Sequence, residues 1–146
     1  MDIEGVIVTK LKIIESSIGS VYHFVKSNDP GYVKFGEAYF STVNFNATKA
    51  WKKHLRMTLN LVVPVGKVKF VIYDDREGST TKGNVFEIEM SPLNYCRLTV
   101  PPEVWVGFKG LSNGVNLIQN IADMVHDPSE QINISPEEFK LQYNWK

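Results

Sequence analysis

The sequence predicts an all-β protein, either a sandwich or a barrel. Short segments of alternating apolar and polar residues recur at a spacing of roughly ten residues, which is typical of strands in such folds. Turn-forming residues, mainly Gly, Pro, Asn and Asp, separate these segments. Only Ser135–Phe139 reads as a helix start, with Pro136 in the first turn and Glu138 three residues after the cap, and we expect a single helical turn there.

The first three expected strands are Gly5–Ile14, Gly19–Val25 and Ala38–Phe45. In each of them Val or Ile residues alternate loosely with polar residues. Such alternation indicates a strand with one face against the core. The segment Asn28-Asp29-Pro30-Gly31 separates the second strand from the third and has the composition of a turn.

The later expected strands have clearer patterns. Leu59–Val65 is a nearly continuous apolar run, which predicts a strand buried on both faces. Lys67–Tyr73 alternates, with every second residue apolar, and Asn84–Met90 and Tyr95–Val100 follow the same period. Asn116–Ile121 is a second apolar run.

Length and composition restrict the classes of function. A chain of 146 residues is expected to form one domain, residues 1–146, around one core. The sixteen basic and sixteen acidic residues cancel, which argues against nucleic acid as a partner, although two or three well-placed cations suffice for one phosphorylated small molecule. No apolar segment has the length of a membrane span, and the N-terminus lacks the layout of a signal peptide. We therefore expect a cytoplasmic protein with no membrane partner.

We expect neither a disulfide nor a metal or other cofactor. Cys96 is the only cysteine, so no disulfide can form within the chain, and a small buried residue is expected there. The three histidines, His23, His54 and His126, are scattered along the chain and do not form a local cluster with a carboxylate, so we expect no metal site.

Four motifs, in order from about Glu37 to Trp145, resemble those of one family. The first is Lys49-Ala50-Trp51-Lys52-Lys53-His54, which resembles Arg-Gly-aromatic-His-x-His/Gln. The second motif is the Gly66–Ser79 hairpin with Asp74-Asp75-Arg76, and the third is the Val100–Phe108 segment with Pro101-Pro102. The fourth consists of two segments near the C-terminus, His126–Glu130 and Tyr143-Asn144-Trp145. Together they resemble the cupin-fold sugar-nucleotide enzymes of deoxysugar biosynthesis, the dTDP-4-dehydrorhamnose 3,5-epimerases and the dTDP-sugar 3,4-ketoisomerases.

The resemblance implies a single-domain cupin, a β-barrel of jelly-roll type. It also implies a homodimer in which N-terminal strands are exchanged or paired across the interface. The apolar segment Val6–Ile14 suits that role.

The resemblance implies a reaction in which a proton leaves a carbon next to a 4-keto group and an enolate forms. In the epimerases a His backed by a carboxylate is the base, a Lys steadies the oxyanion and a Tyr is the acid. This chain departs from that set. Lys52 stands at the place of the base histidine, Leu59 near the place of the lysine, Asn120 near that of the tyrosine, and Val106 at that of a further histidine.

Three residues are candidates for the chemistry. His54 matches the second histidine of the ketoisomerases and is the expected acid or base. The carboxylate that backs the base histidine of the family is expected at Glu137 or Glu138, although Lys52 stands in place of that histidine. Lys52 would be a second base or an electrophile, and His126 an alternate acid. The alternatives are that Lys52 is merely solvated at a strand end and that His126 caps a turn.

The binding half of the motifs is better preserved. Lys49 and Arg76 are expected to hold phosphate. The polar residues Asn60 and Asn120 either contact the ligand or bond to backbone and water.

Four aromatic residues would wall the base or the sugar, or else fill the core. They are Trp51, Trp105, Tyr39 and Phe108, and for Phe108 we favour the core.

The preferred hypothesis is an epimerase or 3,4-ketoisomerase acting on a dTDP-4-keto-6-deoxyhexose through an enolate, with Lys52 in place of the usual histidine. The partner would be a nucleotide-activated sugar. The alternative is a non-catalytic cupin that binds a sugar nucleotide or other carbohydrate after losing the catalytic pair. A weaker possibility is a pocket re-tooled for a free or lipid-linked sugar.

Overall fold

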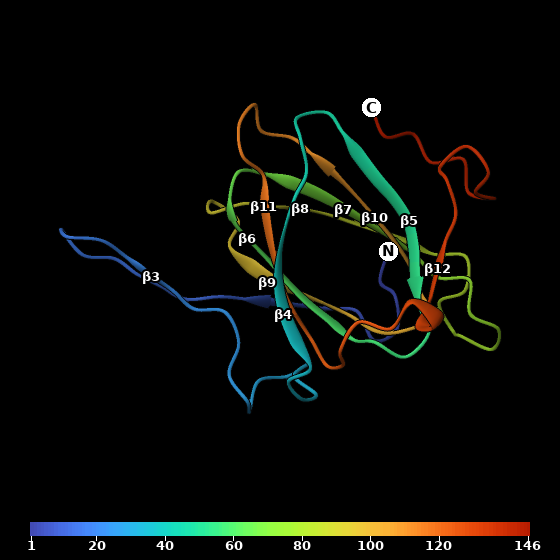
Figure 1. The fold of residues 1–146 in the computed structure, drawn as a ribbon, viewed down its shortest axis with the longest axis horizontal. Coiled ribbons are helices and arrows are strands. Elements are labelled where there is room, and N and C mark those ends of the chain that lie inside the picture. The colour runs from blue at the N-terminus through green and yellow to red at the C-terminus, as the bar shows by residue number, and fades with distance from the viewer.

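The computed structural model describes residues 1–146 and consists of antiparallel β-strands with one short 3-10 turn. Two five-stranded sheets face each other (Figure 1). The first has the order β1 (Ile7–Lys10), β9 (Cys96–Val100), β6 (Leu59–Val65), β11 (Leu117–Ala122) and β4 (Glu37–Thr42). The second has the order β12 (Gln131–Asn133), β5 (Thr48–His54), β10 (Trp105–Gly110), β7 (Val68–Tyr73) and β8 (Val85–Met90). The all-β prediction is confirmed, and no helical segment has the length and apolar character needed to cross a bilayer.

The first two expected strands differ most from the structure. Gly5–Ile14 divides into β1, which pairs with β9, and β2 (Ile13–Ile14), and Gly19–Val25 shortens to β3 (Val21–Tyr22). β2 and β3 pair only with each other and form an arm that projects from the body of the molecule (Figure 1). The side chains there are exposed, so no packed face fixes a longer strand.

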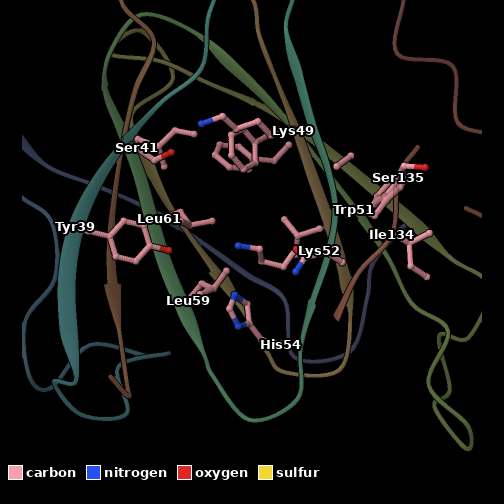
Figure 2. A pocket seen from close by; sticks show the side chains of 16 residues that line it. Tyr39, Ser41, Lys49, Trp51, Lys52, His54, Leu59, Leu61, Ile134 and Ser135 are labelled. Atoms are coloured by element: carbon pink, nitrogen blue, oxygen red, sulfur yellow. The ribbon is translucent and has the colours of Figure 1, made fainter. Parts of the chain in front are cut away.

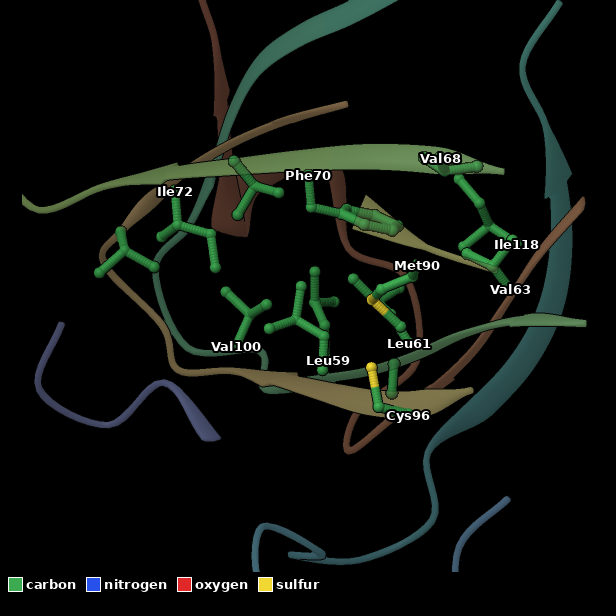
Figure 3. Close-up of a cluster of buried hydrophobic side chains, with 14 of the residues drawn as sticks. Leu59, Leu61, Val63, Val68, Phe70, Ile72, Met90, Cys96, Val100 and Ile118 are labelled. Carbon is green, nitrogen blue, oxygen red and sulfur yellow. The ribbon is translucent and has the colours of Figure 1, made fainter. Parts of the chain in front are cut away.

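The main core lies between the sheets and fills one end of the space between them (Figure 3). Phe70 and Ile72 of β7 point toward Leu61 of β6 and Val100 of β9. Burying a side chain of this size stabilises the fold by roughly 1.5–3 kcal/mol. β6 confirms the prediction of a strand buried on both faces, because its first five residues are buried, and Cys96 is buried as expected.

A second apolar cluster lies on the outer face of β5 and β10. Trp51 stacks on Phe139 with ring centroids 4.8 Å apart, and Trp105 meets the same ring edge-on at 4.9 Å. The expected single turn positions this phenylalanine, since the amide of Phe139 donates to the carbonyl of Ser135 at 3.0 Å. Gly107 is needed here, because a Cβ at this position would lie 2.8 Å from the Trp145 ring. The C-terminal segment therefore covers the outside of β5.

The loop between β7 and β8 is organised around Asp74, which is fully buried. Its carboxylate accepts hydrogen bonds from the Arg76 guanidinium at 2.8 and 2.9 Å and from the hydroxyls of Ser79 and Thr81 at 2.7 and 2.6 Å. The Arg76 guanidinium is the largest influence and holds the pKa of Asp74 well below its usual range. Folding therefore favours the charged form of this carboxyl.

We predict that Asp74→Asn lowers the free energy of unfolding by about 2 kcal/mol at pH 7, because hydrogen bonds to a charged group are lost. The folded-state pKa lies below the unfolded value of about 3.9, so the stabilisation is present above that value and disappears as the pH falls below it. Urea unfolding at pH 7 and at acid pH measures both effects. Glu77→Gln, at an exposed residue of the same loop, is the matched control, and an equal loss for Asp74→Asn at both pH values contradicts the assignment.

Candidate active site

A cavity of about 560 Å³ occupies the end of the inter-sheet space that the core leaves open. Its lining comes from both sheets (Figure 2). The apolar lining includes Leu59, Leu61, Phe70, Val106, Phe108 and Ile118. The polar lining includes Tyr39, Ser41, Lys49, Lys52, His54, Asn133 and Ser135. A few polar groups on an apolar background are typical of small-molecule sites.

An irregularity in β5 sets which side chains enter the cavity. Lys52 lies opposite Val106 of β10, and Lys49 lies opposite Phe108, so β5 has one residue more than β10 in this interval. Such a bulge changes the alternation of side chains along a strand. As a result Lys49, Lys52 and His54 all line the cavity (Figure 2).

His54, at the lower end of the cavity in Figure 2, forms a buried pair with Glu130. The Nδ1 atom of His54 is hydrogen-bonded to Oε1 of Glu130, and the two side chains are only 8% and 1% exposed. Glu130 ends the 3-10 turn η1 (Pro128–Glu130), which begins after Asp127, whose side chain accepts a hydrogen bond from the Ser129 amide at 2.9 Å. The remaining ring nitrogen of His54, Nε2, is the one left for a ligand.

The carboxylate of Glu130 is held from three sides. Besides His54, it accepts hydrogen bonds from the backbone amides of Arg56 and Met57 at 3.2 and 3.3 Å. Burial alone would raise the pKa of Glu130, but these hydrogen bonds outweigh it and hold the pKa below its ordinary value. The group facing His54 is therefore a carboxylate at neutral pH.

The two lysines of the cavity occupy different places. Lys52 is two residues before His54, on the same face of β5, and its side chain is exposed at the cavity mouth. It is not enclosed by apolar groups, as a lysine acting as a base would be. Lys49 lies toward the opposite end of the cavity (Figure 2) and donates to the backbone carbonyl of Thr42 at 2.7 Å.

Five of the expected site residues lie outside the cavity, namely His126, Arg76, Trp105, Asn60 and Asn120. His126, the expected alternate acid, is exposed and does not line the cavity, so it is not placed beside Lys52 and His54. Arg76 lies in the β7–β8 loop and is bonded to Asp74 and to the Glu4 carbonyl, so it is not in position to hold phosphate in this cavity.

The expected aromatic walls are also corrected. Trp105 faces the outer cluster, where its Nε1 donates to Asp75 at 2.9 Å and the Lys53 ammonium lies 4.7 Å from its ring. Trp51 borders the cavity but lies on the far side of β5, beside Ile134 (Figure 2). Neither ring is free to stack on a ligand. Phe108 does line the cavity.

Asn60 and Asn120 are buried and bonded within the protein, and neither lines the cavity. The Asn60 side chain donates to the Gly31 carbonyl at 3.0 Å and accepts from the Thr99 hydroxyl at 2.7 Å. The Asn120 side chain accepts from the Asn60 amide at 3.0 Å and donates to the Tyr39 hydroxyl at 3.1 Å. Ligand contact is thus not the role of these asparagines, although Asn120 reaches the cavity through Tyr39.

Glu130, the partner of His54, was not among the predicted site residues. Glu137 and Glu138, the expected positions of the family's carboxylate, are both exposed, and Glu138 accepts from the Ser135 hydroxyl at 3.2 Å. A signal was present, because an N-cap aspartate followed by Pro128 predicts a short turn that ends at Glu130. No cluster of three or more His, Cys, Asp and Glu side chains is placed to bind a metal ion.

Comparison with known proteins identifies the family of this chain. The model of one family, described as dTDP-4-dehydrorhamnose 3,5-epimerase, matches residues 1–146. The chain belongs to this family. A crystal structure of a dTDP sugar isomerase from Desulfovibrio desulfuricans G20 is 36% identical and superposes with a TM-score of 0.89, covering 93% of this chain and 87% of that one. The prediction of a cupin jelly roll is therefore confirmed.

Two curated proteins are also similar to this chain. The spore coat polysaccharide biosynthesis protein SpsL of Bacillus subtilis strain 168 is 27% identical over 145 residues, which are 98% of this chain and 96% of that protein. The probable low-salt glycan biosynthesis epimerase Agl13 of Haloferax volcanii is 28% identical over 108 residues, 73% of this chain and 66% of that protein. Both names indicate the biosynthesis of polysaccharides or glycans.

The pairing with a carboxylate predicts that His54 carries its proton on Nδ1 when the ring is neutral. Long-range ¹H–¹⁵N spectra of the histidine rings measure this directly. Glu130→Gln is expected to give a mixture of the two tautomers, because an amide can donate or accept, whereas Glu138→Gln is expected to leave the spectrum unchanged. A wild-type ring protonated on Nε2 contradicts this assignment.

Proposed function

We propose that this protein epimerises or keto-isomerises a dTDP-linked 4-keto-6-deoxyhexose by proton transfer through an enolate. The observation that carries the proposal is the buried His54–Glu130 pair, which opens onto an apolar cavity that also contains two lysines. Membership of the epimerase family and the similarity to a dTDP sugar isomerase support the substrate class.

His54 is the base of the proposed reaction. Its Nδ1 is occupied by Glu130, so Nε2 of the neutral ring has a free lone pair for the proton next to the 4-keto group. The buried carboxylate stabilises the imidazolium that forms and keeps the ring oriented. The proposed base thus stands two residues after Lys52 on β5, and its carboxylate partner comes from η1.

Lys52 acts as the electrophile. It lies on the same face of β5 as His54, and its ammonium group at the cavity mouth has no carboxylate partner. A cation beside the carbonyl oxygen stabilises the negative charge that develops as the enolate forms. This role fits an exposed, charged lysine better than the role of a base.

Lys49 binds the diphosphate. One of its three N–H donors is used by the Thr42 carbonyl, so the others remain for phosphate oxygens. Lys49 lies toward the other end of the cavity from His54, which suits a ligand whose sugar and phosphates occupy different ends (Figure 2). Phe108 and Phe70 add apolar surface to the lining of the same cavity.

We predict that the protein catalyses the exchange of a sugar C–H in heavy water when it is incubated with a dTDP-4-keto-6-deoxyhexose. Because His54 would remove this proton, His54→Asn is expected to lower the exchange rate by at least about a hundredfold. Mass spectrometry and NMR of the recovered sugar measure deuterium at C3 and C5. His23→Asn, at a histidine outside the cavity, is the control.

Binding of dTDP with no exchange by the wild-type protein would reject the enzymatic proposal and select the binding-only alternative. Exchange that survives in His54→Asn would remove this histidine from the role of base. Lack of binding by any dTDP compound would instead point to another carbohydrate.

We predict that Lys49→Met weakens the binding of dTDP about tenfold, because one charge-assisted contact to phosphate is lost. Calorimetry at two salt concentrations measures the effect, which should shrink as the salt concentration rises. Lys82→Met changes an exposed lysine of the β7–β8 loop and is expected to bind normally. An unchanged dissociation constant for Lys49→Met excludes this residue from phosphate binding.

A further inference from the structure

The groups assigned so far act from one wall of the cavity. His54 and Lys52 both belong to β5, in the sheet that also contains β10 and β7. Inversion at a carbon requires that the proton leave from one face of the sugar and return from the other. The returning proton must then come from the facing sheet, where β4 contributes two protic side chains to the cavity, Tyr39 and Ser41.

We propose that Tyr39 is the acid that returns the proton, held in place by Asn120; this inference rests on the function proposed above. The two residues lie directly opposite each other in the β4–β11 pairing. Asn120 is fully buried, and Tyr39 extends from it into the cavity, toward the wall that carries His54 and Lys52 (Figure 2).

The hydrogen bonds of Asn120 fix the direction in which Tyr39 donates. The backbone amide of Asn60 can only donate, so the atom of Asn120 that faces it, at 3.0 Å, must be the carbonyl oxygen. The amide nitrogen of Asn120 therefore faces the Tyr39 hydroxyl, at 3.1 Å, and donates to it. The phenol oxygen accepts this bond and keeps its own hydrogen for a group in the cavity.

Tyr39 suits this role better than its neighbour Ser41. A phenol loses its proton far more readily than an aliphatic alcohol, whose hydroxyl is a poor acid. The bond from Asn120 also stabilises the phenolate that remains after the proton has left, because a donor to the charged form favours that form.

The step balances without any other reactant. Nε2 of His54 takes the proton from the carbon next to the carbonyl, and the C–H electron pair becomes the enolate double bond while the carbonyl oxygen gains the negative charge. The enolate carbon then forms a bond to the Tyr39 proton on the opposite face, and the oxygen charge returns to the carbonyl. Water reprotonates the phenolate, and the imidazolium of His54 loses its proton to water.

Separate measurements of exchange and inversion test the inference. Tyr39→Phe is expected to keep deuterium exchange within about threefold of wild type, since His54 is intact, and to lower formation of the inverted sugar by about a hundredfold. Asn120→Asp keeps the shape of the side chain but replaces the donor by an acceptor, which turns the Tyr39 proton away from the sugar, so the same split is expected. Tyr32→Phe, outside the cavity, should match wild type in both measurements.

Calorimetry with dTDP and circular dichroism show whether the variants bind and fold normally, as the inference requires. Inversion at the wild-type rate in Tyr39→Phe overturns the assignment, and so does a loss of inversion in Ser41→Ala with Tyr39→Phe unaffected. Equal losses of exchange and inversion in Tyr39→Phe also overturn it, because they indicate a structural role. If the wild-type protein shows no exchange, the proposed function itself fails, and this result is distinct from the others.

Discussion

The site depends on β5, a strand that must satisfy two surfaces at once. On its outer face, Trp51 packs against Phe139 and fastens the C-terminal segment to the sheet. On its inner face, Lys49, Lys52 and His54 face the cavity. Because the side chains of a strand point to opposite faces, the position of each inner residue follows from the packing of its outer neighbours and from the extra residue opposite β10. The packing on the outer face of β5 therefore largely determines where the side chains lie in the cavity.

The difference between positions that only pack and positions that form the site also explains how much the sequence could predict. β6 and β7 were clear because their patterns depend only on burial, whereas the lysines of β5 hide its alternation, and only the motif marked this segment. Arg76 failed as a site residue because Asp74, two residues away, binds its guanidinium. Glu130 was missed because its contact with His54 spans 76 residues, and no local pattern in one sequence encodes such a distance.

The assignment also changes how the departures from the family motif are understood. Lys52 at the place of a histidine and Asn120 near that of a tyrosine look like losses when each position is considered alone. In the folded chain, His54 and Tyr39 still line the cavity. His54 lies two residues after Lys52 on β5, and Tyr39 lies opposite Asn120 on the neighbouring strand β4. A cavity between two sheets needs suitable groups on each wall, and neighbouring positions on a wall can supply them.

The arm formed by β2 and β3 has few stabilising contacts with the rest of the molecule. Its base is fixed where the Tyr95 hydroxyl donates to the His23 carbonyl at 2.7 Å, but Ile14, Ile18 and Val21 are exposed. A two-stranded hairpin by itself is only marginally stable in water, since it buries little apolar surface against the entropy of ordering its backbone. The arm thus belongs to the least protected part of the molecule, where the amide hydrogens exchange soonest and a protease finds its first cut.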